Sequence, residues 1–155
     1  MTLYVNKDKL PACTIPGLIL IMCFFCSSSV LADSFQGQVN RAFFTTKLKK
    51  NEPVNEVLIL ENTIQDLYFF SDVKNMQGKT LLHVWEYQGK RILSKKFKIT
   101  KNRQRLISKI KLQSAKTGEW MVIIEDEQGL PVKAVVFKYV KKGSFAGKGI
   151  IPVKR

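Results

Sequence analysis

The stretch TLLHVWEYQGKRILSKKFKITKNRQRLISKIKL, residues 80–112, decides the fold of this chain. It contains three runs rich in aromatic, aliphatic and β-branched residues, separated by short polar links at Gln88-Gly89 and Thr100–Asn102. From Arg103 to Leu112, polar and apolar residues alternate with a period of two, which is typical of a strand with one buried face. No helical period continues over a dozen residues, so the stretch predicts consecutive β-strands.

The same pattern of short β-rich runs and polar links continues on both sides of this stretch. It predicts an all-β protein, specifically an immunoglobulin-like antiparallel β-sandwich of about 7–8 strands. The predicted strands cover Val39 to Leu48, Val54 to Leu60, Leu67 to Asp72, Thr80 to Tyr87, Arg91 to Ile99, Arg103 to Leu112, Trp120 to Glu125 and Val132 to Tyr139.

The first 32 residues have the features of a bacterial-type secretory signal peptide. A weakly basic start precedes an apolar run from Leu18 to Cys26, and a Ser-rich stretch ends in Val30-Leu31-Ala32. The apolar run is shorter than the roughly 20 residues of a membrane span, which favours cleavage after Ala32 over an uncleaved anchor. We therefore expect a periplasmic or secreted protein, with a β-sandwich domain at residues 33–140 and a basic, glycine-rich flexible tail at 141–155.

Export also bears on the cysteines, because all three of them lie in the predicted signal peptide. The exported domain would then have no disulfide framework, although disulfides are common in oxidising compartments. Its stability would have to come from burial and strand pairing alone.

Positive charge is concentrated in one part of the sequence. The chain has 26 Lys and Arg residues against 12 Asp and Glu, and between Tyr87 and Gly118 it has no acidic residue. If the strands that end at Ile99 and begin at Arg103 form a hairpin, their solvent faces join into one cationic surface. The alternative is that these lysines only keep an exposed strand edge from aggregating. The candidate anion-binding residues are Lys96, Lys98, Arg103, Arg105, Lys109 and Lys111.

A cationic surface of this kind predicts an anionic partner. In the envelope that partner would be a lipid headgroup, lipopolysaccharide or another polyanion, or an acidic protein surface. Nucleic acid is disfavoured because base stacking needs exposed aromatic side chains in the patch. The aromatic residue there, Phe97, is predicted to face inward.

A second group of candidates is aromatic. His83, Trp85 and Tyr87 share one face of a predicted strand, and Trp120 begins another. These residues could form a binding strip or a site that handles protons. We favour the interpretation that Trp85 and Trp120 anchor the core and that His83 is hydrogen-bonded locally, since buried polar groups normally find partners.

The sequence offers no catalytic, cofactor-binding or metal-binding constellation. A lone histidine needs further ligands for zinc, and Glu125-Asp126-Glu127 lacks the spaced oxygen ligands of a calcium loop, so a solvated turn is predicted there. An enzymatic alternative would require His83 to act with Glu86 or Tyr87.

Five short motifs occur in order along the chain: Arg41-Ala42-Phe43-Phe44-Thr45-Thr46, Asn51-Glu52-Pro53-Val54, Leu67-Tyr68-Phe69-Phe70, His83-Val84-Trp85-Glu86-Tyr87-Gln88-Gly89 and Thr117-Gly118-Glu119-Trp120. Together these motifs resemble a bacterial family named domain of unknown function 2914. The resemblance covers Val39 to Val136 and implies an immunoglobulin-like β-domain without an established activity. One departure is that the family usually has an aromatic residue after the strand ending at Ile99, where this chain has Asn102-Arg103-Gln104-Arg105.

These observations predict an exported domain that binds rather than catalyses. Its expected partner is an anionic envelope component or an acidic protein. The alternative is a structural or assembly subunit of an envelope complex, in which an exposed strand edge pairs with a strand of a partner.

Overall fold

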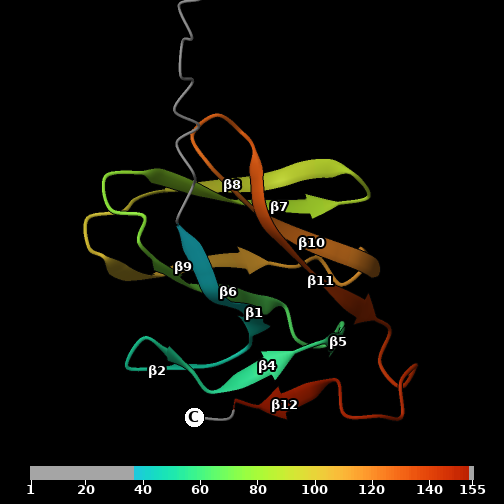
Figure 1. The fold of residues 1–155 in the computed structure, drawn as a ribbon. Helices are drawn as coiled ribbons and strands as arrows, with labels where there is room; N and C mark the ends of the chain where they lie inside the picture. The colour runs from blue at the N-terminus through green and yellow to red at the C-terminus, as the bar shows by residue number, and fades with distance from the viewer. Residues whose placement is uncertain (1–36, 154–155) are drawn as a thin grey trace, which may run out of the picture. The chain divides into compact units, whose positions relative to one another are not determined.

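The computed structural model describes residues 37–153. The predicted signal peptide and its cleavage site lie outside the described residues. Within this range every regular element is a β-strand, and no helix has the length and apolar character of a membrane span. The predicted all-β sandwich is confirmed (Figure 1).

The first sheet has five strands in the order β12-β4-β1-β6-β9, and each neighbouring pair is antiparallel. A two-stranded hairpin of β2 (Leu48–Lys49) and β3 (Glu52–Pro53) follows β1. The strands of the first sheet are β1 (Gln38–Thr45), β4 (Asn55–Val57), β6 (Asp66–Lys74), β9 (Arg103–Lys111) and β12 (Ile150–Pro152).

The second sheet also has five strands, in the order β5-β11-β10-β7-β8. Its pairs are antiparallel except for the short parallel pair of β5 and β11. Its strands are β5 (Ile59–Glu61), β7 (Thr80–Tyr87), β8 (Lys90–Lys98), β10 (Gly118–Glu125) and β11 (Pro131–Val140).

The strand order is that of an immunoglobulin-like domain. In such domains A, B and E are neighbours in one sheet, and G, F, C and C′ are neighbours in the other. Here β1-β6-β9 and β11-β10-β7-β8 take those places. Trp85 on β7 is fully buried, which is the position of the buried tryptophan on strand C.

The main core lies between the two sheets and is rich in aromatic residues. Phe44 contacts the rings of Phe69, Trp85 and Phe137, with centroids 4.6–5.6 Å apart. Trp120 is also buried and stacks on Tyr87. These contacts confirm that Trp85 and Trp120 are core anchors.

The predicted strand from Val54 to Leu60 is interrupted. It changes sheets at Leu58, so that β4 belongs to the first sheet and β5 to the second. The backbone N–H groups of Leu58 and Ile59 both donate to the carbonyl oxygen of Gly149, at 2.8 and 3.0 Å. This crossover closes one side of the sandwich.

The tail after Lys141 is not flexible throughout, because β12 within it pairs with β4. The glycine content that predicts flexibility has a different cause at Gly149. A Cβ atom there would lie 2.3 Å from the carbonyl oxygen of Ile59, so only glycine permits this close approach. The tail prediction is therefore wrong for residues 150–152.

Candidate functional site

The two most basic strands, β8 and β9, do not form a hairpin. They are the end strands of opposite sheets, and the link 100–102 carries the chain from one sheet to the other. The side chain of Gln104 fixes this crossover, because its Oε1 accepts from the backbone N–H of Thr100 and its Nε2 donates to the carbonyl of Lys98. A three-residue polar link looks the same in sequence for a hairpin and for a crossover, which is why the hairpin interpretation was wrong.

The side of the sandwich formed by β8, the link 99–102, β9 and residues 112–117, here named the basic side, is still lined by cations. On β9 the odd-numbered residues face solvent, whereas Leu106, Ser108 and Ile110 face the core, as the alternation predicts. The two strands leave their outer edges without a neighbouring strand. The basic side therefore consists of two open strand edges rather than one continuous sheet face.

Four of the six candidate anion-binding residues form ion pairs with carboxylates that lie outside the acid-free segment 88–117. Arg105 pairs with Glu52 of the β2–β3 hairpin, and Lys109 pairs with Asp66 at 3.1 Å, which raises the pKa of Lys109 through that hydrogen bond. Lys96 lies 3.8 Å from the exposed Glu127. The charge of these residues is partly neutralised within the fold.

Arg103 has a structural role. Its Nε lies 3.0 Å from both carboxylate oxygens of Asp72, and the hydrogen bonds to Asp72 raise the pKa of Arg103. Asp72 is buried and is also the cross-strand neighbour of Arg41 and Arg105. Replacing Arg103 by an uncharged residue would remove a partner from a buried carboxylate, which is destabilising.

The remaining two candidates, Lys98 and Lys111, have no ion-pair partner among residues 37–153. Three further lysines of the basic side, outside the candidate set, have neither an ion pair nor a side-chain hydrogen bond in this described range. These three are Lys90, Lys101 and Lys116. Together the five lysines carry the positive charge that the fold leaves available.

Lys95 was missed by the sequence analysis. Its Nζ donates to the carbonyl oxygen of Ile107 on β9 at 3.0 Å and lies 5.2 Å from the ring centre of Phe97. Lys95 thus spans from the edge of one sheet to the edge of the other. The sequence does contain a sign of this role. Lys95 lies two residues from both Leu93 and Phe97, so the alternation along the strand places it on the same, inward side as these apolar residues.

His83 lies in the interior and has hydrogen bonds on both ring nitrogens. Its Nε2 lies 2.9 Å from Ser71 Oγ and its Nδ1 lies 3.0 Å from Ser108 Oγ. Trp85 Nε1 donates to the same Ser108 Oγ at 3.0 Å. Burial, and to a smaller extent the charge of Lys95, lowers the pKa of His83 to about 3. The imidazole is therefore neutral at pH 7, as expected for a buried histidine with local partners.

The residues proposed to act with His83 in the enzymatic alternative have other partners. Glu86 lies 3.7 Å from Arg91, and Tyr87 Oη donates to the carbonyl of Thr117. His83 itself has no exposed surface. The structure thus does not bring these three side chains together at a surface.

The acidic cluster at residues 125–127 is only partly a solvated turn. Glu125 is buried and binds Arg91 Nη2 at 2.6 Å, which corrects the prediction for that residue. Asp126 Oδ1 accepts from the backbone N–H groups of Gln128 and Leu130 and so closes the turn. Within the described part of the chain, no group of three or more His, Cys, Asp or Glu residues has a metal-binding arrangement.

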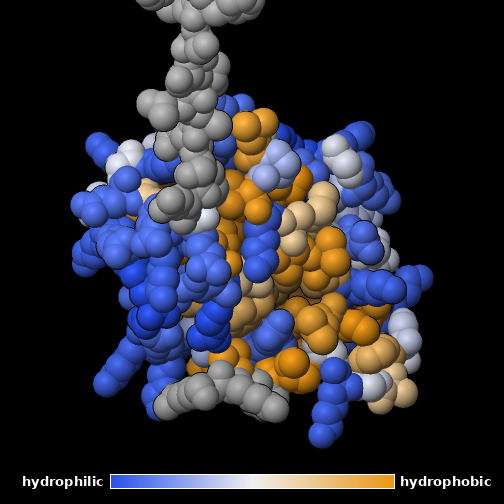
Figure 2. All heavy atoms as spheres, in the orientation of Figure 1, coloured by the Kyte–Doolittle hydropathy of each residue, from blue (hydrophilic) through white to orange (hydrophobic). Residues whose placement is uncertain are grey.

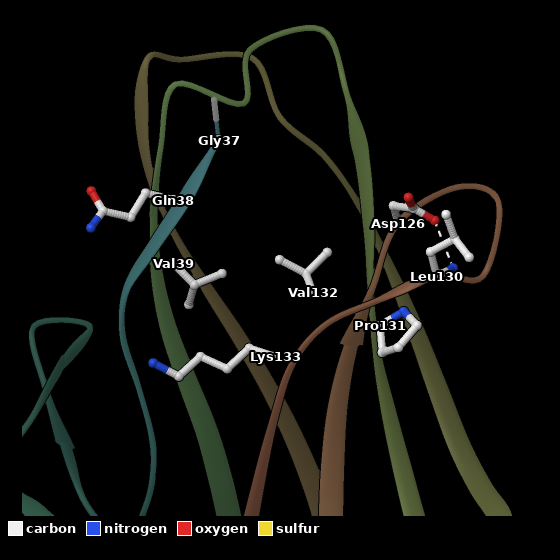
Figure 3. Close-up of a pocket in the computed structure, with 8 residues that line it drawn as sticks. All are labelled: Gly37, Gln38, Val39, Asp126, Leu130, Pro131, Val132 and Lys133. Carbon is white, nitrogen blue, oxygen red and sulfur yellow. Dashed lines mark hydrogen bonds between the residues drawn. The ribbon is translucent and has the colours of Figure 1, made fainter. Parts of the chain in front are cut away.

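A second surface feature lies on the opposite side of the sandwich, between β1 and β11. The N-terminal half of β1 pairs only with β6, and residues 131–137 of β11 pair only with β10. Between these two edges is a hollow across which Val39 and Val132 point toward each other (Figure 3). Apolar atoms reach the surface between β1 and β11 in the space-filling view (Figure 2).

In comparisons with known proteins, a family model matches part of this chain. The model described as protein of unknown function (DUF2914) matches residues 78–139, a segment that runs from the start of β7 nearly to the end of β11. It includes the motifs at His83–Gly89 and Thr117–Trp120, whereas the motifs in β1, the β2–β3 hairpin and β6 precede it. No curated protein matches the chain. The part of the chain that contains the basic side and the His83 strand, residues 78–139, is therefore similar to the DUF2914 family.

Proposed function

We propose that this protein is an exported, non-catalytic binding domain whose basic side engages an anionic partner. The partner is an anionic component of the envelope or an acidic protein. The observation that supports this best is the set of five lysines without ion pairs beside two open strand edges. No acidic residue lies between positions 88 and 117, so an approaching anion meets no opposing charge from this segment.

Replacing four unpaired lysines by glutamine is expected to abolish binding to vesicles that contain phosphatidylglycerol. The variant is Lys98→Gln, Lys101→Gln, Lys111→Gln and Lys116→Gln. Arg103 is left intact because it pairs with buried Asp72. Since surface substitutions usually change stability by less than about 0.5 kcal/mol each, the melting temperature should stay close to that of the wild type. Vesicle co-sedimentation at increasing salt measures the effect, which ionic screening should weaken.

The matched control removes the same charge from the end of β11 and the loop after it. It carries Lys138→Gln, Lys141→Gln, Lys142→Gln and Lys148→Gln, at positions separated from β8 in the strand order by β10 and β7. This control should keep most of its binding. Equal losses in both variants would show that net charge, and not the basic side, determines binding.

Export is the other part of the proposal. We expect a mature species that begins at Asp33 and is released by osmotic shock, because the apolar run in residues 18–26 is too short to span a bilayer. N-terminal sequencing of the released protein checks this. An intact Met1 in the membrane pellet would contradict it.

A second candidate function, an assembly subunit, is favoured by the open edges of β1 and β11. Both edges flank the apolar hollow of Figure 3, and an extended segment of a partner could pair there. In this case a complex formed with an envelope protein should persist at 0.5 M salt and should be lost in Val132→Lys. The four-lysine variant should retain it. Size-exclusion chromatography of the complex distinguishes these results.

A further inference from the structure

A small hollow lies on the basic side, between the open edges of β8 and β9. Its floor includes the buried Ile110 and Trp120, and its wall on β8 is formed by Ile92 and Leu93. These two wall residues are 43% and 38% exposed, although both are large and apolar. The hollow thus offers an apolar surface on an otherwise strongly charged side of the domain.

The rim of this hollow is positively charged. Lys109, Lys111 and Lys116 line it, and no carboxylate does. Lys109 is paired with Asp66, whereas Lys111 and Lys116 have no ion-pair partner in the described range. A ligand whose apolar group enters the hollow would therefore bind most favourably if it carries negative charges next to that group, where they can contact the lysines of the rim.

The size and surroundings of the hollow favour a single side chain of an extended polypeptide. Its volume is about 260 Å³, which is below the range of roughly 300–1,000 Å³ for pockets that hold a whole small molecule. The edges of β8 and β9 beside it present main-chain N–H and C=O groups with which an added strand could pair. Lysines along such an edge repel another basic strand but attract an acidic one.

We propose that this hollow, together with Lys111 and Lys116, binds an extended acidic segment of a partner protein. One apolar side chain of the segment fills the hollow, and carboxylates next to it in the sequence contact the two lysines. This inference rests on the proposed binding function of the basic side. It specifies where an acidic protein partner would bind and which side chains of the partner would make the contacts.

The test uses fluorescein-labelled peptides and the purified protein at 0.15 M salt. The probe is Glu-Glu-Leu-Glu-Glu, and the comparison peptide has serine in place of leucine. The leucine peptide should bind at least tenfold more tightly by fluorescence anisotropy. In NMR spectra the indole N–H signal of Trp120 should shift on binding, whereas that of Trp85, which is bonded to Ser108 in the core, should not.

Two double variants separate the hollow from general electrostatics. Lys111→Gln with Lys116→Gln should weaken binding of the leucine peptide at least tenfold. Lys98→Gln with Lys101→Gln removes the same charge and should weaken it less than threefold. Lys98 is about 17 Å along β8 from Leu93 at ~3.3 Å per residue, which exceeds the screening length of ~8 Å at this salt concentration.

The outcomes are distinguishable. Equal binding of the two peptides, or equal losses in the two double variants, would overturn the hollow as an anchor site. Polyglutamate or phosphatidylglycerol vesicles would then still bind to the basic side, and only the loss of both would contradict the proposed function itself. Displacement of the leucine peptide by phosphatidylglycerol vesicles, with a shift of the same Trp120 signal, would assign the hollow to lipid and also overturn this inference.

Discussion

Truncation of Trp120 to alanine is expected to lower the free energy of unfolding by about 3–5 kcal/mol, the usual range for a buried large aromatic residue. Only 2% of Trp120 is exposed. Its indole stacks on Tyr87 with centroids 4.7 Å apart, and its Nε1 donates to the carbonyl of Lys116 at 3.0 Å. Alanine would leave a cavity between the sheets and free the loop 113–117. Chemical denaturation of both proteins measures the loss.

The control for this prediction is Leu130→Ala, which removes a large apolar side chain from a position that is 63% exposed. Its effect should be within about 0.5 kcal/mol. An unchanged stability of Trp120→Ala would contradict its role as a core anchor. If peptide binding were lost at the same time, Trp120 would serve only as the floor of the hollow.

Acidification is expected to destabilise the domain through His83. The pKa of this group is about 3 in the folded protein and about 6.5 when unfolded, so the unfolded state binds more protons between these values. Stability from this group is complete above pH 6.5 and falls as the pH decreases toward 3. Between pH 7 and 5 its contribution to the free energy of unfolding should decrease by about 2 kcal/mol.

The variant His83→Gln provides the comparison. Glutamine does not titrate, so the fall in stability between pH 7 and 5 should be about 2 kcal/mol smaller in this variant than in the wild type, whatever its stability at pH 7. Denaturation curves at both pH values give the difference. The same pH dependence in both proteins would show that His83 is not the group responsible.

The alternation of side chains made the central strands predictable from the sequence. The strand from Thr80 to Tyr87 has the predicted bounds, and the inward residues of β9 and β10 are those that the period of two indicates. The break at Leu58 and the pairing of β12 were not predictable in this way. Both depend on the close approach of Gly149 to Ile59, a contact between segments far apart in the sequence.

The charge of the basic side could also be predicted only in part from the sequence. The positive charge can be recognised in the sequence as a segment without acidic residues, but the carboxylates that neutralise part of it come from β6, the β2–β3 hairpin and the turn after β10. Asp66 and Glu52 are brought to Lys109 and Arg105 only by the fold. The residues that remain available, such as Lys111 and Lys116, could be separated from the paired ones only after strand pairing was known.

The hydrogen bonds of His83 have a consequence for how the two sheets are aligned. His83 and Trp85 belong to the second sheet, whereas Ser71 and Ser108 belong to the first. Apolar faces in contact tolerate small lateral displacements because dispersion forces have little directionality, but hydrogen bonds weaken steeply when their geometry changes. This polar link should resist sliding of one sheet over the other. Residues 37–153 contain no cysteine, so the two sheets keep a single lateral alignment without a disulfide bond between them.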